Sequence, residues 1–100
     1  MYVKTHANSG EGNHRCVIAV CDKNLLGKTL QQGDIEIKVS ESFYKGELKE
    51  EAEVIVLLKD ASNVNLIGKE SVAAGIKAGV VEKENVIIIQ GVPHAQYISA

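Results

Sequence analysis

The stretch "RCVIAVC", residues 15–21, decides how we expect this chain to fold. Inside it, apolar residues that are β-branched or small follow one another without polar alternation, which is typical of a strand covered on both faces. Before it, "YVKTHA" (2–7) alternates weakly, and "NSGEGN" (8–13) carries the glycines and short polar residues of a hairpin loop. We therefore predict an N-terminal β-hairpin whose second strand is central in a sheet and whose first strand lies nearer an edge.

Further strands are predicted after this hairpin and towards the end of the chain. The segment "DKNLLGKTLQQGD" (22–34) has the polar residues and glycine breaks of a connection. After it, "IEIKVS" (35–40) alternates apolar and polar residues, as a half-buried strand does. Near the end, "VIIIQ" (86–90) predicts a short buried strand, and "GVPHAQYIS" (91–99) predicts an extended segment.

Two helices are predicted in the second half of the chain. The segment "ELKEEAEVIVLLKDA" (47–61) repeats apolar residues at helical spacing and has its acidic residues in the first turns, where they suit the helix dipole. The segment "KESVAAGIKAG" (69–79) repeats the pattern and ends on a glycine suited to a C-cap. Between them, "SNVNLIG" (62–68) is interpreted as a break. The buried face of the first helix is expected to hold Leu48, Ala52, Ile55, Leu58 and Ala61, with Val54, Val56 and Leu57 packed on its flanks.

The predicted order of elements is strands, then two helices, then strands. This order favours an α+β fold over a doubly wound sheet. We predict one two-layer domain over residues 1–100, with a mostly antiparallel sheet, an N-terminal hairpin, two central helices and C-terminal strands. Gly75 would cost about 1 kcal/mol relative to Ala inside the second helix. We therefore expect another backbone to approach closely there.

The composition narrows the classes of function. The net charge is −2 and the one arginine is Arg15, so no field of the whole molecule attracts nucleic acid. Four aromatic residues and no tryptophan disfavour a platform for stacking single-stranded bases. No apolar stretch approaches the roughly 20 residues that span a bilayer, and the N-terminus lacks the pattern of a secretion signal. We expect a cytoplasmic protein that binds neither DNA nor membranes.

Two short motifs are related to anion sites. "LLGKT" (25–29) resembles the end of a phosphate-binding loop, but the required earlier glycine is replaced by Asp22, and no helix follows. The motif therefore disfavours nucleotide hydrolysis. "NLIGKES" (65–71) places Gly68 before a helix that begins with Lys69, which is either a weak anion site or an ordinary cap.

Metal binding is not predicted. Cys16 and Cys21 lie five residues apart on one strand, so their side chains point to opposite faces. His14 shares a face with Cys16, but two ligands do not complete a tetrahedral zinc site. We interpret the cysteines as core residues, and no motif predicts a cofactor.

The most unusual chemistry lies in "GVPHAQYIS" (91–99). Gly91 can take a positive φ, and Pro93 holds its predecessor extended, although the sequence leaves a cis or trans Val92–Pro93 bond open. Beyond this bend His94 and Gln96 share one face. They either fasten the terminal strand to the sheet or form a small polar recognition patch, and catalysis would need a nucleophile or carboxylate from elsewhere.

The chain resembles the archaeal family known as domain of unknown function 424. The segments that carry the resemblance span the chain, and they are "MYVK", "AVCDKNLLGKT", "SESFYKGE", "NLIGKESV" and above all "GVPHAQ". The hairpin "HANSGEGNHR" is longer than expected for the family, which disfavours a functional role for His6 or His14. The resemblance implies a small archaeal cytoplasmic protein without established activity, encoded near translation genes such as that of the beta subunit of archaeal initiation factor 2.

These observations lead to a binding module as the functional hypothesis, with a protein or RNA of the translation machinery as partner. The hypothesis assumes that the C-terminal segment folds back beside the start of the second helix. An RNA partner would need a basic patch of Arg15, Lys28 and Lys69, whereas a protein partner would use apolar contacts near Phe43 and Tyr44. The alternative is a small enzyme or small-molecule binder with a pocket at His94 and Gln96. The binding surface is expected to combine Gly91, Pro93, His94 and Gln96 with Asn65, Gly68 and Lys69.

Overall fold

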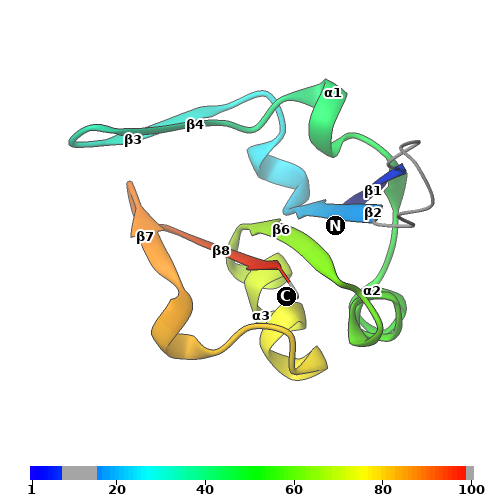
Figure 1. The fold of residues 1–100 in the computed structure, drawn as a ribbon. Helices are drawn as coiled ribbons and strands as arrows, with labels where there is room; N and C mark the ends of the chain where they lie inside the picture. The colour runs from blue at the N-terminus through cyan, green and yellow to red at the C-terminus, as the bar shows by residue number, and fades with distance from the viewer. Residues whose placement is uncertain (8–15, 99–100) are drawn as a thin grey trace.

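The structure, a computed structural model, describes residues 1–7 and 16–98 and has an α+β fold (Figure 1). In spatial order, the main sheet of this part of the chain consists of β5 (Glu47–Leu48), β1 (Tyr2–Ala7), β2 (Cys16–Cys21), β6 (Asn63–Ile67), β8 (Val92–Ile98) and β7 (Ile87–Ile89). A separate pair is formed by β3 (Thr29–Gln32) and β4 (Ile35–Lys38). The helices are α1 (Glu41–Tyr44), α2 (Glu51–Lys59) and α3 (Lys69–Ala78), with 3₁₀ turns at Lys23–Leu25 and Lys83–Asn85.

The N-terminal hairpin is confirmed, and β2 is an interior strand as predicted. It pairs antiparallel with β1 and parallel with β6, and Val20 and Cys21 are fully buried. The predicted loop at residues 8–13 lies outside the described residues. Every other pairing within the main sheet is antiparallel, so the prediction of a mostly antiparallel sheet is also confirmed.

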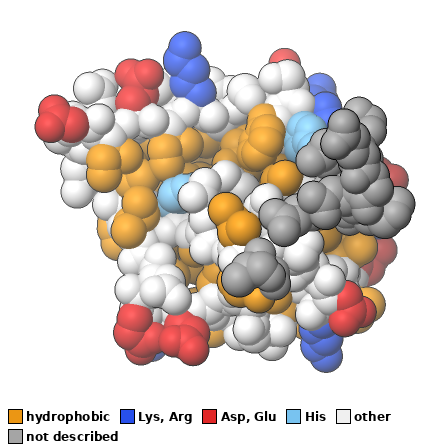
Figure 2. Space-filling view, in the orientation of Figure 1, with side chains coloured by type: hydrophobic (Ala, Val, Ile, Leu, Met, Phe, Trp, Pro, Cys, Tyr) orange, Lys and Arg blue, Asp and Glu red, His pale blue; other side chains and the backbone are white. Residues whose placement is uncertain are grey.

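The connection predicted at residues 22–34 contains a strand. There β3 pairs with β4 in a two-stranded arm that extends away from the main sheet (Figure 1). The strand predicted at 35–40 exists, but Ile35 at its start is half exposed because the arm has little structure on either side. Hydrophobic side chains gather on this side of the molecule between the arm and β7 (Figure 2).

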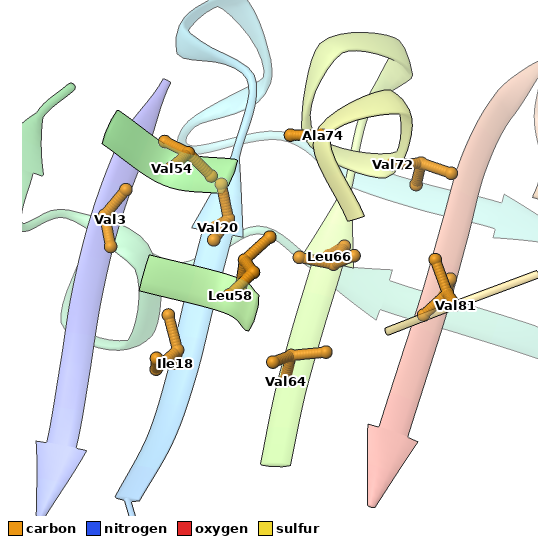
Figure 3. Close-up of a cluster of buried hydrophobic side chains, with 11 residues drawn as sticks. Val3, Ile18, Val20, Val54, Leu58, Val64, Leu66, Val72, Ala74 and Val81 are labelled. Carbon is orange, nitrogen blue, oxygen red and sulfur yellow. The ribbon is translucent and has the colours of Figure 1, made fainter. Parts of the chain in front are cut away.

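The main sheet has a hydrophobic cluster on each face. On one face α2 and α3 pack on the sheet, as predicted for the two helices, and Leu58 of α2 lies among strand side chains such as Val20 and Leu66 (Figure 3). On the other face the segment from the first 3₁₀ turn to α1 covers Cys21, Ile67 and neighbouring residues. This second cover is partial. It agrees with the prediction that the strand at 15–21 is covered on both faces, although the segment that supplies it was not predicted.

The first predicted helix begins later than expected. Residues 47–48 form β5 beside β1 rather than a helical turn. α2 starts at Glu51, and the N–H of its N-cap residue Glu50 donates to Glu53 Oε1. Gly46 lies so close to the Val3 carbonyl that a Cβ would overlap it, which directs the chain along the edge of the sheet. Of the predicted flank residues Val54 is fully buried, but Val56 is 69% exposed and Leu57 is 38% exposed. The prediction that both flanks are packed was therefore wrong.

The segment 62–68 was wrongly predicted as a break, because most of it forms the interior strand β6. Its asparagines lower the β-propensity, but Val64 and Leu66 are fully buried between β2 and β8. The second helix is confirmed, with Gly79 in a left-handed C-cap. The close neighbour of Gly75 is the Leu66 side chain and not a backbone, so that detail of the prediction was wrong.

The last two strands form a tight hairpin. Gln90 and Gly91 have φ angles of 53° and 78°, as a two-residue turn between antiparallel strands requires, and the described residues contain no cis peptide bond. Ile89 is buried as predicted, whereas Ile87 and Ile88 are about half exposed because β7 is an edge strand. No helix within residues 1–7 and 16–98 has both the length and the apolar character needed to cross a membrane.

Candidate functional site

The pairing of β6 with β8 brings the predicted site residues together from two parts of the chain. Asn65 lies opposite Gln96, and Ile67 lies opposite His94. Beyond β6, the Gly68 N–H donates to the Pro93 carbonyl at 2.9 Å. The C-terminal segment thus runs beside the residues that lead into α3, as the binding hypothesis assumes.

His94 is held by the sheet. Its side chain is only 8% exposed, and its Nδ1–H donates to the Leu66 carbonyl at 2.8 Å. Burial lowers the pKa of His94, and the hydrogen bond to Leu66 opposes this shift. The ring is therefore neutral near pH 7, with Nε2 as its remaining acceptor. Of the two roles considered for His94, fastening the terminal strand to the sheet or recognising a partner, the structure favours the first.

Gln96 and Asn65 belong to a row of uncharged polar side chains. Gln96 is exposed, and Asn65 Oδ1 accepts a 2.6 Å hydrogen bond from the Tyr44 hydroxyl. Burial raises the pKa of Tyr44 to about 12, so the hydroxyl keeps the proton that it donates. The register of β6 and β8 places four polar residues on this face of the sheet, and we call them the amide face: Asn63, Asn65, His94 and Gln96.

A hollow of about 270 Å³ lies at one end of the amide face. It is lined by Asn85, Ile87, His94, Ala95 and Gln96. The enzymatic alternative requires a nucleophile or a carboxylate beside His94. None of these five residues supplies either group, so this hollow lacks the third member that catalysis would need.

A carboxylate that follows β2, that of Asp22, lies at the start of α3, whereas in the sequence Asp22 is notable only as a departure from a phosphate-binding loop. Asp22 is buried and accepts hydrogen bonds from the Glu70 N–H at 3.1 Å, the Ser71 N–H at 2.9 Å and the Ser71 hydroxyl at 2.8 Å. A Cβ on Gly68 would overlap this carboxylate. Asp22 therefore occupies the helix N-terminus that was considered as a weak anion site, and it caps the helix in place of the N-cap residue Gly68.

Comparison with known proteins places this geometry in a family. Residues 10–99 match the family model described as "Protein of unknown function (DUF424)". The chain belongs to this family. Among solved structures it is similar to an uncharacterized conserved protein from Methanopyrus kandleri, with 24% sequence identity, a TM-score of 0.80, and coverage of 99% of this chain and 92% of that chain. That likeness shows a shared fold, and comparison with curated proteins gives no match.

Other residues singled out from the sequence are spread over this DUF424 fold. Arg15 and His14 lie outside the described residues. Lys28 is exposed at the start of the arm, whereas Lys69 borders a separate hollow that also contains Lys23, Asp22 and Glu70. The charges around Lys69 are therefore mixed, and a basic patch that includes Arg15 stays a prediction.

The aromatic pair predicted as an apolar docking patch is largely used inside the DUF424 fold. Tyr44 is buried, and Phe43 is partly buried and stacks on the His6 ring with a centroid distance of 4.7 Å. His6 Nε2 also lies 2.8 Å from the Phe43 carbonyl. These contacts hold α1 against β1, which gives His6 a structural role and leaves little of the pair for a partner.

The structure also locates one of the two cysteines. Cys21 is buried, as predicted, and burial raises the pKa of its thiol to about 11, so it stays protonated. The side chain of Cys16 lies outside the described part of the chain. Among the described residues, no three His, Cys, Asp or Glu side chains are grouped in a way that could hold a metal ion.

Proposed function

We propose that this DUF424 chain is a non-catalytic binding module and that its partner docks on the amide face. The observation that carries this proposal is the join between β6 and β8, which places Asn65 and Gln96 side by side although they are far apart in the sequence. Gln96 is exposed, and a carboxamide both donates and accepts hydrogen bonds. Such a face suits recognition of an uncharged surface.

The charge of this region favours a protein partner over RNA. Phosphate contacts dominate RNA affinity and require lysine or arginine. The four residues of the amide face carry no formal positive charge when His94 is neutral, and Lys69 is accompanied by Asp22 and Glu70. In Figure 2 charged side chains lie around the rim of the molecule, while its centre is hydrophobic or uncharged. A protein surface is the better match.

The family resemblance supports a partner within the translation machinery. This support comes from the association with translation genes that the resemblance implies, and not from the geometry of the amide face. Sedimentation of an extract from the native cells provides a direct check. The chain is expected to move with ribosomal or initiation-factor fractions, and a distribution confined to the free protein fractions contradicts this part of the proposal.

A charge substitution on the amide face tests the proposal and separates the two classes of partner. We expect Gln96→Arg to reduce protein capture from the native cell extract by about tenfold, because a solvated cation must be buried against an uncharged surface. Gln31→Arg is the matched control, since Gln31 is also an exposed strand residue but lies on the arm. Capture is measured by quantitative mass spectrometry, with and without nuclease.

The alternatives give different results in the same measurement. Unchanged capture by Gln96→Arg would mean that the amide face is not the docking site. If the partner is RNA, Gln96→Arg strengthens capture, nuclease removes it, and added salt weakens it steeply. Either result contradicts the proposal of a protein partner at this face.

A further inference from the structure

We infer that the partner adds a β-strand to the outer edge of β8, as an extended segment of protein that pairs with Ala95–Ile98. This inference rests on the proposed function and specifies how the partner binds. The starting observation is a difference in length: β8 has seven residues, whereas its outer neighbour β7 has three. β7 pairs only with Val92, Pro93 and His94. Among the described residues, no strand pairs with the outer side of Ala95–Ile98.

The direction of the backbone groups on this edge follows from one hydrogen bond. The Pro93 carbonyl accepts from the Gly68 N–H, which follows β6 directly, so the backbone groups of Pro93 point towards β6. In an antiparallel ladder the direction alternates from residue to residue. The backbone N–H and C=O groups of Ala95 and Tyr97 therefore point towards β6, while those of Gln96 and Ile98 point outwards. Four backbone groups on this edge have the spacing that an added strand requires.

The side chains beside this edge also suit an added strand. The hollow of about 270 Å³ is lined by Ile87, His94 and Gln96, at the point where the outer neighbour strand ends. Ile87 is 46% exposed and Ile98 is 64% exposed. A strand opposite Gln96 would place every second side chain on the side of the hollow, where an apolar residue would cover Ile87. We therefore expect a partner segment with alternating apolar residues.

A second copy of this chain is a weaker candidate for the occupant. The open edge spans four residues, Ala95–Ile98, and pairing of two such edges would bury much less than the roughly 1,200 Å² typical of stable protein interfaces. An extended peptide can bind usefully through a short edge, because its main-chain hydrogen bonds supply affinity and the adjacent hollow supplies selectivity. The inference therefore concerns a strand from a different protein.

Peptides selected from a displayed random library provide the probe. In the enriched sequences we expect apolar residues at every second position. Each peptide is then synthesised in two forms. One form is methylated at the odd-numbered backbone nitrogens and the other at the even-numbered ones, so that only one form blocks the N–H groups that face β8. Methylation in the phase that faces β8 should weaken binding by about tenfold or more, while the other phase should leave it within about threefold. Equal effects of the two phases, or no enriched peptide, would overturn the inference.

Two variants of the protein give an independent readout. Gln96→Pro removes an outward N–H that makes no bond to β6, and it is expected to weaken peptide binding by about tenfold or more. Gln96→Ala is the reference variant, because it removes the carboxamide but keeps the N–H, so the loss in Gln96→Pro beyond that in Gln96→Ala measures the backbone hydrogen bond and is expected to be about tenfold or more. If Gln96→Pro does not fold, the methylated peptides still decide the question.

The failure of this inference differs from the failure of the proposed function. Suppose that Gln96→Arg weakens peptide binding but the two methylated forms of each peptide bind equally. This result would support the amide face as the site and exclude strand addition. Peptides insensitive to Gln96→Arg and to methylation phase would contradict both. A dimer of the chain, measured by analytical ultracentrifugation and lost in Gln96→Pro, would identify a second copy as the occupant and overturn the inference.

Discussion

At the scale of single residues, the Asp22 carboxylate connects parts of the chain that are 48 residues apart. It accepts hydrogen bonds from the first turn of α3 and complements the positive end of that helix. The Ser71 hydroxyl adds a third hydrogen bond within a buried site. Gly68 makes room for this arrangement, because a side chain there would overlap the carboxylate. The end of β2 and the start of α3 are thus joined by one side chain.

Asp22→Asn is expected to lower the free energy of unfolding by about 1–3 kcal/mol. The amide keeps the shape of the carboxylate, but it loses the charge and replaces one acceptor oxygen with a donor that faces other donors. Urea denaturation followed by circular dichroism gives the measurement. Asp34→Asn is the control, because Asp34 is an exposed residue of the arm. Equal midpoints for the two variants would contradict this role of Asp22.

At the scale of elements, α2 shows how a helix can be apolar all round and still bury one side. Val54 and Leu58 are fully buried against the sheet (Figure 3). Val56 is 69% exposed. The apolar pattern predicted Ala52 on the buried side and Val54 on a flank, but Ala52 is exposed and Val54 is fully buried. The pattern misled because valine and leucine occur on both sides of this helix. Contact with β1 and β2 selects the buried side, so the orientation of this helix is a tertiary property.

A matched pair of substitutions tests this orientation. Val54→Ala should lower the free energy of unfolding by about 2 kcal/mol, because it removes buried methyl groups and leaves a cavity. Val56→Ala should change the same quantity by at most about 0.5 kcal/mol, because the side chain is mostly in water and alanine favours the helix. Denaturant titration of both variants gives the comparison. Similar losses for the two would show that Val56 is also packed.

At the scale of the whole molecule, the last strand of the chain lies inside the main sheet. β8 is placed between β6 and β7, and the Leu66 carbonyl fastens the His94 ring to the neighbouring strand. The folded protein therefore holds His94 buried and in its neutral form. The stability of the molecule is expected to depend on the protonation of this residue.

The sign of that pH dependence follows from the lowered pKa of His94. The unfolded chain takes up a proton near pH 6.5, whereas the folded chain does so only at lower pH. The His94 contribution to stability is complete above pH 6.5 and is lost as the pH falls from 6.5 towards the folded pKa. His94→Gln should therefore lose less stability than the parent chain between about pH 7.5 and about pH 5, measured by urea denaturation. Equal losses would contradict the assignment.

Several features were predictable because their signals are local. The apolar run that becomes β2, the helical spacing of α3 and the glycine at its C-cap all act within a few residues. The shared face of His94 and Gln96 also follows from the two-residue period of a strand. The role of Asp22 had no comparable signal, because its hydrogen-bond donors come from a distant segment.

The amino-acid sequence by itself determined the α+β class, the N-terminal hairpin, α3 and the side of the last strand on which His94 and Gln96 lie, because near neighbours set backbone periodicity. Only the tertiary structure decided that Asn63–Ile67 is an interior strand, that residues 47–48 leave the helix for a sheet edge, and that β8 has an open outer side. Those outcomes depend on which strands pair across the sheet. Such pairing is a competition among distant segments for buried surface and backbone hydrogen bonds, which no local pattern records.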